Sequence, residues 1–120
     1  MTRDVAQKLG YYKAASIYSS FFPALKGLNE KMSSSVPSTC VLLTDKAADI
    51  KTKINKHAKP GGQQTEEEHR RLGANLDIDI PYYWLMFFME DDDKLEDIKN
   101  KYSKGELLTG EVKAILIKEI

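Results

Sequence analysis

The chain has 120 residues, of which 42% are hydrophobic and 30% are charged, a composition that excludes a disordered tail and predicts a folded globular unit. Lysine plus arginine equals aspartate plus glutamate at 18 each, which excludes the overall basic charge typical of many nucleic-acid-binding proteins. A single cysteine, Cys40, excludes an internal disulfide and fits a reducing compartment.

The first third of the chain has the pattern of one helix followed by two strands. Residues 2–9 have helical character and stop at Gly10, a residue type that commonly ends helices. Residues 13–22 are rich in Ile, Tyr and Phe and are closed by Pro23, and residues 38–43 form a second apolar stretch. We expect both stretches to be strands. Because two strands alone do not make a stable sheet, we also expect the chain to be a piece of a longer protein.

A short polar loop, from Lys31 to Ser35, lies between the two predicted strands. An ammonium group together with serine hydroxyls and backbone amides can hold the phosphates of a nucleotide. Taken alone, such a loop is more often an ordinary solvated turn, so its neighbours in the sequence decide its meaning.

The rest of the chain is predicted to be helical, beginning near Asp45. Asp45 is expected to cap a helix over residues 46–58, in which apolar residues recur at helical spacing and which ends at Pro60. Thr65, followed three residues later by Glu68, is typical of a capping box that opens a short helix.

Three further helices follow. Pro81 is expected to open a helix over residues 82–89, which is apolar all round and so should be central to a helical cluster. Asp92 or Asp93 should start the next helix, and Glu111 should start the last one. The fold class predicted from this order is α/β followed by all-α, with the boundary between residues 1–44 and residues 45–120.

The longest apolar run, residues 82–89, is far shorter than the roughly 20 residues that span a bilayer, and the residues after Met1 lack the apolar run of a signal peptide. We therefore expect a cytoplasmic protein without a membrane partner. The histidines, His57 and His69, have no second His or Cys at ligand spacing, so no metal site within the chain is expected.

Charge is unevenly distributed along the chain. Residues 46–59 carry five lysines against one aspartate, and residues 90–97 carry six acidic residues against one lysine. A solvated face is the usual explanation of such runs, although the basic helix could bind a partner.

The loop from Lys31 to Ser35 reads KMSSS and resembles the KMSKS loop of class I aminoacyl-tRNA synthetases. Further blocks in a single register with it resemble the eukaryotic type of tryptophanyl-tRNA synthetase. These blocks read MTRDVA (1–6), SFFPAL (20–25), IKTKINKHA (50–58), GGQQTEEEHR (61–70), GANLDID (73–79), FFMEDDDKL (87–95) and LTGE (108–111). The resemblance covers essentially the whole chain.

The resemblance implies a Rossmann-type α/β catalytic domain, of which residues 1–44 would be the C-terminal end. It implies a helical anticodon-binding domain, to which residues 45–120 would belong, in an enzyme that is usually a homodimer. Such an enzyme uses ATP with Mg²⁺ to convert tryptophan into tryptophanyl-adenylate, and it then transfers the tryptophanyl group to tRNA(Trp).

The resemblance assigns the five residues of the loop to ATP. Lys31 would meet the phosphates, where negative charge builds up as the tryptophan carboxylate attacks. Met32 would lie near the adenine, and Ser33 and Ser35 would donate to phosphate oxygens. Ser34 stands where the usual motif has a second lysine, which leaves Lys31 as the only cation of the loop.

The resemblance also places the basic helix and the loop after it at the tRNA anticodon stem. Lys56 and Lys59 would contact phosphates, and Gln63 and Gln64 would hydrogen-bond base edges of the anticodon. A helix end followed by a polar turn explains these residues equally well.

Class I synthetases need a second signature, the HIGH motif, and the chain has no such motif. We therefore expect that the 120 residues alone do not activate tryptophan. The alternative function is a non-enzymatic helical module that binds RNA or another partner and retains the loop as a relic.

Overall fold

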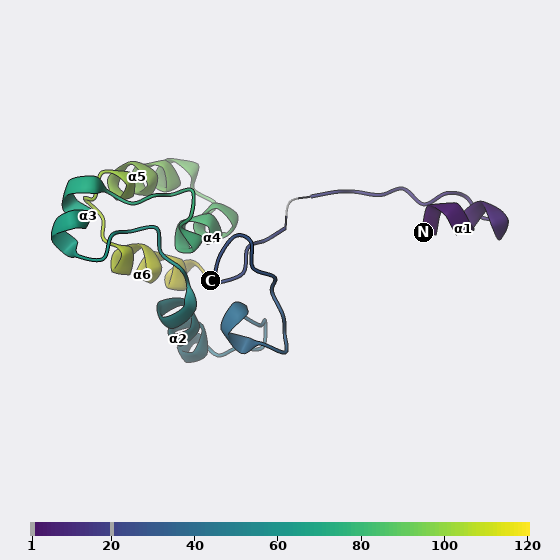
Figure 1. Ribbon diagram of the computed structural model, residues 1–120, viewed down its shortest axis with the longest axis horizontal. Helices are drawn as coiled ribbons and strands as arrows, with labels where there is room; N and C mark the ends of the chain where they lie inside the picture. Colours follow the sequence, from purple (N-terminus) through teal and green to yellow (C-terminus); the bar gives the residue numbers. More distant parts are fainter. Residues whose placement is uncertain (1, 20) are drawn as a thin grey trace.

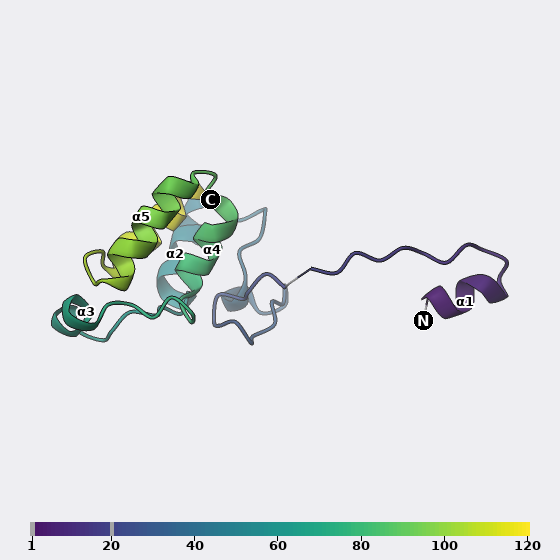
Figure 2. The same ribbon diagram turned by 90° about the horizontal axis from the view of Figure 1, so that it is seen from above.

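The computed structural model describes residues 2–19 and 21–120, and every regular element within these residues is a helix (Figure 1). In chain order the elements are α1 (Thr2–Lys8), the short 3-10 helix η1 (Pro37–Thr39), α2 (Ala47–His57), α3 (Glu66–Leu72), α4 (Ile80–Phe88), α5 (Asp92–Ser103) and α6 (Thr109–Glu119). Helices α2 to α6 form one cluster, whereas α1 lies at the far end of an extended arm (Figures 1 and 2). This arm gives the chain its long dimension, with extents of 65 × 28 × 24 Å. None of the described helices is long and apolar enough to cross a bilayer.

The two predicted strands are not formed in the described part of the chain. Residues 13–19, 21 and 22 have no regular structure, and residue 20 lies outside the described residues. The second stretch, residues 38–43, begins inside η1 and continues as coil and turn. A strand needs a neighbouring strand to pair its backbone groups, and these two stretches do not pair with each other. The strand prediction is therefore wrong for this structure, whereas the helical prediction for the later residues is met by α2 to α6.

A side-chain cap marks the start of three helices. Thr65 before α3, Asp79 before α4 and Asp91 before α5 each accept a hydrogen bond from the backbone amide three residues later. Pro81 occupies the first turn of α4, where its missing N–H costs nothing. Gly73 ends α3 at a φ of 71°, a value that glycine adopts without strain.

Asp45 does not cap α2, contrary to the prediction. Lys46 stands at the N-cap position and makes no side-chain hydrogen bond there. Asp45 Oδ2 instead accepts hydrogen bonds from Leu42 N at 2.8 Å and from Lys53 Nζ at 2.5 Å. The Lys53 ammonium, followed by the Leu42 amide, holds the pKa of Asp45 below its ordinary value. Asp45 thus closes the turn before α2 rather than the helix end itself.

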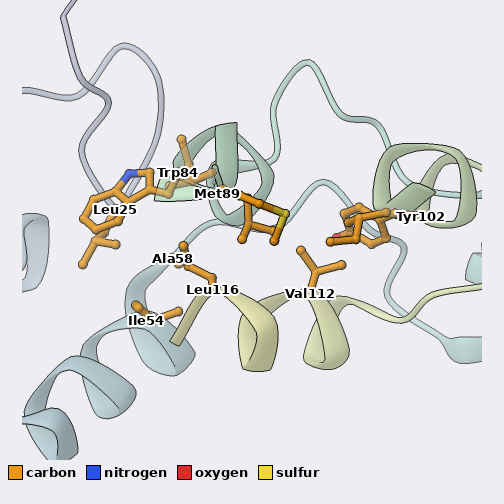
Figure 3. Packing of buried hydrophobic residues seen from close by; sticks show 11 residues of the cluster. Leu25, Ile54, Ala58, Trp84, Met89, Tyr102, Val112 and Leu116 are labelled. Atoms are coloured by element: carbon orange, nitrogen blue, oxygen red, sulfur yellow. The ribbon is translucent and has the colours of Figure 1, made fainter. Parts of the chain in front are cut away.

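One hydrophobic core joins α2, α4, α5 and α6, and Figure 3 shows its members meeting side by side. The buried members of this core are Leu25, Ile54, Ala58, Ile80, Trp84, Leu85, Met89, Ile98, Tyr102, Val112 and Leu116. Helix α4 contributes Trp84 and Leu85, but Met86, Phe87 and Phe88 remain exposed to between 41% and 58%. Helix α4 is therefore central to the cluster, as predicted, on only part of its surface.

The segment before the loop docks onto this helical core. Trp84 Nε1 donates a hydrogen bond to the carbonyl of Pro23 at 3.0 Å. The ring of Phe22 lies with its centroid 4.7 Å from that of Trp84 and 4.8 Å from that of Phe87. Leu25 is completely buried. Residues 22–25 therefore fix where the following loop emerges relative to α4.

Candidate nucleotide loop and adjoining polar linker

The loop from Lys31 to Ser35 lies on the surface just before η1. Lys31, Met32, Ser34 and Ser35 are exposed, and only Ser33 is half-buried. The hydroxyls of Ser33 and Ser35 lie 2.8 Å apart and hydrogen-bond each other. One cation and three hydroxyl groups are therefore gathered on a short accessible loop.

Thr39 holds the middle of this loop from outside it. Its Oγ1 lies 3.1 Å from Ser33 N, 3.1 Å from the carbonyl of Ser33 and 2.7 Å from the carbonyl of Val36. The oxygen accepts from the amide, and its single proton serves one of the two carbonyls at a time. Val36 N also donates to the Ser33 carbonyl at 3.0 Å. Both backbone polar groups of Ser33 are thus satisfied locally.

An apolar hollow of about 620 Å³ opens beside the loop. Its lining consists of Phe21, Phe22, Leu28, Asn29, Glu30, Lys31 and Met32. A volume of this size suits a small-molecule ligand that is largely buried on binding. The lysine of the loop and an apolar wall are therefore neighbours, as the phosphates and the ring system of a nucleotide would require.

Backbone hydrogen bonds connect the loop base to the linker after α2. Leu25 N donates to the Thr39 carbonyl at 2.9 Å, and Lys59 N donates to the Leu25 carbonyl at 2.8 Å. Ile80 N in turn donates to the Lys59 carbonyl at 3.0 Å, at the start of α4. Segments far apart in the sequence are thus tied together beneath the loop.

The two lysines expected at the tRNA lie near the end of α2. Lys56 is in the last turn of the helix and is exposed. Lys59 is also exposed, and its Cδ lies 4.0 Å from where a Cβ would stand on Gly27, in the segment that leads to the loop. Lys59 is therefore close to both the helix and the loop segment.

The two glutamines expected at the anticodon lie in the polar linker, residues 58–65, which joins α2 to α3. Gln63 and Gln64 are both exposed, and Gln63 Nε2 donates to the Gly73 carbonyl at 3.1 Å. Both line a small hollow of about 190 Å³ that is also bordered by Thr109 and Gly110. The structure thus brings the glutamines together beside the start of α6 and orients one of them.

Asp79, the residue before α4, is a buried acceptor that binds this linker at Gly61. It is completely buried, and its Oδ2 accepts from Gly61 N at 2.6 Å and from the Tyr102 hydroxyl at 2.7 Å. Its Oδ1 accepts from Tyr82 N at 2.7 Å. Burial, followed by the charge of Asp79, raises the pKa of Tyr102 well above its ordinary value. A buried carboxylate is tolerated here because three donors surround it.

His69 supports the same linker from the side of α3. Its Nε2 lies 2.9 Å from the Leu107 carbonyl and must carry the proton, while Nδ1 accepts from Gln63 N at 3.4 Å. A Cβ added to Gly62 would stand 3.0 Å from His69 Nδ1 and only 2.3 Å from Thr109 Oγ1. The glycine is therefore required by close packing, and His69 is a structural residue with satisfied ring nitrogens.

Thr39, Asp79 and His69 were missed as organising residues by the sequence reasoning. Asp79 carries a local signal, because an aspartate two residues before a proline is a good helix cap. Thr39 and His69 gave no recognised signal, since the bonds that give them this role, to Ser33 and to the Leu107 carbonyl, span 6 and 38 residues. Cys40 is buried and is not part of a disulfide. Among the described residues, no group of three or more His, Cys, Asp or Glu is arranged to hold a metal ion.

Comparisons with known proteins give one consistent result. The family described as "tRNA synthetases class I (W and Y)" matches residues 1–120. The chain is 56% identical over 117 residues to the cytoplasmic tryptophan–tRNA ligase of Oryctolagus cuniculus, covering 98% of this chain and 25% of that protein. It is 59% identical over 113 residues to the cytoplasmic tryptophan–tRNA ligase of Arabidopsis thaliana, covering 94% and 28%. The chain thus spans about a quarter of the length of these relatives.

Solved structures agree with the sequence comparisons. The tryptophanyl-tRNA synthetase from Giardia lamblia is similar over 97% of this chain and 29% of its own, with a TM-score of 0.85 and 49% identity. The tryptophanyl-tRNA synthetase from the archaeon Aeropyrum pernix K1 is similar over 98% of this chain and 32% of its own, with a TM-score of 0.86 and 32% identity.

Proposed function

Because the chain belongs to the class I tRNA synthetases of the tryptophan and tyrosine type, we propose that it is a segment of a tryptophan–tRNA ligase. The observation that carries this proposal is the 56% identity to a ligase of that name across 98% of the chain. The whole enzyme would join tryptophan to ATP as tryptophanyl-adenylate, release pyrophosphate, and transfer the tryptophanyl group to tRNA(Trp).

Lys31 is the catalytic residue that this segment supplies. Its ammonium would meet the ATP phosphates, where negative charge grows on the α-phosphate and the leaving pyrophosphate. A charge that grows during the reaction is stabilised more in the transition state than in the ground state, which is what accelerates the step. The exposure of Lys31 beside the 620 Å³ hollow supports this role.

Met32 and the serines complete the nucleotide site. Met32 lines the apolar hollow and would contact the adenine. Ser33 and Ser35 would donate to phosphate oxygens, for which the hydrogen bond between their hydroxyls must open, and Ser34 would be the loop residue that stands in place of a second lysine. Mg²⁺ would be held mainly by the phosphates and water, since it prefers oxygen ligands and keeps part of its hydration shell.

The polar linker is proposed to face the tRNA anticodon. Lys56 and Lys59 would contact phosphates, which gives affinity without reading sequence. Gln63 and Gln64 border a hollow of about 190 Å³ in which a splayed base edge could be hydrogen-bonded. The bond from Gln63 Nε2 to Gly73 leaves the amide oxygen of Gln63 available as an acceptor.

The proposed domain organisation follows the same boundary as the sequence pattern. Residues 1–44 would close a Rossmann-type catalytic domain, where residues 13–22 and 38–43 would find strands to pair with. Residues 45–120 would form part of the anticodon-binding domain. A cytoplasmic location is inferred from the names of the relatives, and a homodimer from the family as a whole.

A hybrid enzyme tests the proposal. The chain would replace the aligned segment of the Oryctolagus cuniculus ligase, and tryptophan-dependent ATP–pyrophosphate exchange would be measured. We expect activity in the hybrid and a loss on the order of 100-fold in Lys31→Ala, the effect of removing one group that stabilises transition-state charge. Lys26→Ala, an exposed lysine of the same segment, is the matched control. An active hybrid in which Lys31→Ala has no effect would contradict the catalytic role.

Assays on the isolated chain distinguish the ligase segment from the alternative, a non-enzymatic RNA-binding module. The helical core closes on itself, which also suits a helical RNA-binding module without catalysis. We expect the 120 residues alone to show no ATP–pyrophosphate exchange, and measurable exchange would refute that expectation. Salt-dependent binding of tRNA by the chain, together with an inactive hybrid, would favour the non-enzymatic module.

A further inference from the structure

The buried Thr39 hydroxyl is hydrogen-bonded to the backbone of the proposed nucleotide loop. Ser33 is the half-buried centre of that loop, and Thr39 Oγ1 accepts from its amide and shares its own proton between the carbonyls of Ser33 and Val36. We infer that Thr39 is the positioning residue of the loop and sets where Lys31 carries its charge. This inference rests on the proposed function and deepens it by naming a residue outside the loop.

Thr39 is suited to this role because it is itself fixed. It is only 7% exposed, and its carbonyl accepts from Leu25 N at 2.9 Å. Leu25 is completely buried in the core that includes α4. Thr39 and Leu25 thus connect the loop to the packed helical cluster. A group that stabilises developing charge must be held in a fixed position, and this connection supplies such support.

The hydroxyl, and not the bulk of Thr39, makes the connection. Cys40 Sγ also reaches the Ser33 carbonyl, at 3.5 Å, but a thiol is a weak donor and leaves the Ser33 amide to Thr39. Thr39→Val keeps the shape and removes every hydrogen bond of the hydroxyl, so the partly buried Ser33 amide loses its acceptor. Thr39→Ser keeps the hydroxyl and loses only a methyl group.

The first experiment measures amide hydrogen exchange in the 120-residue chain and needs no enzymatic activity. We expect Thr39→Val to speed exchange at Ser33 N on the order of tenfold, and Thr39→Ser to leave it close to wild type. The rate is read relative to Met89 N, whose bond to the Leu85 carbonyl lies in the core, so a general loss of stability cancels. Thr52→Val is the matched control, because the Thr52 hydroxyl bonds only the Ala48 carbonyl within α2. Unchanged exchange at Ser33 N in Thr39→Val would overturn the inference.

The second experiment measures ATP–pyrophosphate exchange in the hybrid enzyme described above. We expect Thr39→Val to lower kcat about tenfold with a smaller change in KM for ATP, because a misplaced cation loses mainly transition-state interaction. Thr39→Ser should restore the rate. Full activity of Thr39→Val in a hybrid that Lys31→Ala disables would overturn the role of Thr39 and leave the proposed function intact. Full activity of Lys31→Ala itself would instead refute the proposed catalytic role of Lys31.

Discussion

The helical cluster and the N-terminal arm contain similar kinds of apolar residue, but these are buried in the cluster and exposed in the arm. In the helical cluster Ile54, Leu85 and Leu116 are completely buried. In the N-terminal arm Tyr12 and Ile17 are fully exposed. Helices bond their own backbones and need only one apolar face covered, so four of them can close a core among themselves. Strand-forming residues also need a neighbouring strand, and the arm has none beside it.

The helical cluster and the N-terminal arm have different roles. Burial in the cluster supplies the free energy that holds the chain together, and it provides the platform on which residues 22–25 dock. The arm and the loop carry exposed side chains whose partners would be other molecules or other segments. Matched substitutions in the two regions should therefore differ strongly in their effect on stability.

The largest expected effect is the difference between a buried leucine of the cluster and an exposed leucine outside the helices. Leu116→Ala removes a completely buried side chain of α6 and should lower the free energy of unfolding by about 2–5 kcal/mol. Leu43→Ala, at an exposed position before α2, should change it by less than about 0.5 kcal/mol. Urea denaturation followed by circular dichroism measures both. Equal losses in the two variants would show that the exposed segment packs onto the cluster after all.

Asp79→Asn should have the second-largest effect, because it replaces a buried carboxylate that receives three hydrogen bonds. An amide cannot accept from all three donors, and we expect a loss of about 2–3 kcal/mol in the free energy of unfolding. Asp77→Asn, two residues earlier and exposed, is the matched control and should be nearly silent. Faster exchange at Gly61 N would show that the linker loosens. A loss no larger than that of the control would mean that Asp79 does not organise the linker.

The helical part was predictable from sequence because its signals are local. Thr65 and Asp91 start helices through bonds to amides three residues away, and Gly73 stops one through its own backbone angle. The capping prediction for Asp45 was wrong because two sets of donors compete for its carboxylate: the free backbone amides at the start of α2, and the pair formed by Leu42 N and Lys53 Nζ. The pair wins in the structure because it includes a charged donor.

The strands and the organising residues of the site were not predictable for a different reason. Residues 13–22 have strand-forming composition, but pairing depends on residues elsewhere that composition does not reveal. The loop from Lys31 to Ser35 was recognised from its own sequence motif, KMSSS. Thr39 was not, because the bond that matters joins it to a backbone group whose position is fixed only by the fold.

Alkaline pH tests the buried hydrogen bond between the Tyr102 hydroxyl and Asp79. Burial and Asp79 raise the pKa of Tyr102 in the folded chain above its ordinary value of about 10. Below pH 10 the hydroxyl is protonated in both states and its stabilising contribution is complete. As pH rises above 10 the unfolded chain releases its proton first, so the free energy of unfolding should fall. Tyr102→Phe should cost about 1 kcal/mol at neutral pH and should make the alkaline decline shallower.

Tyr12→Phe is the control for removing a tyrosine without touching the core, since Tyr12 is fully exposed in the arm. It should leave the free energy of unfolding at neutral pH unchanged within about 0.5 kcal/mol. An alkaline decline that Tyr102→Phe leaves as steep as in the wild type would contradict the assignment to Tyr102.

The smallest expected effect lies at the border between the two regions, in the pair of Asp45 and Lys53. The pKa of Asp45 is lowered in the folded chain, first by the hydrogen bond from Lys53 and then by Leu42 N. Ionised Asp45 therefore contributes to the free energy of unfolding at pH values above the ordinary carboxyl pKa of about 4, and this contribution is lost as pH falls below it. Asp45→Asn should remove part of that acid dependence in a pH series of urea denaturation, whereas Asp49→Asn, an exposed residue of α2, should not. Identical acid profiles for Asp45→Asn and wild type would show that the turn at the border contributes nothing to the stability of the helical cluster.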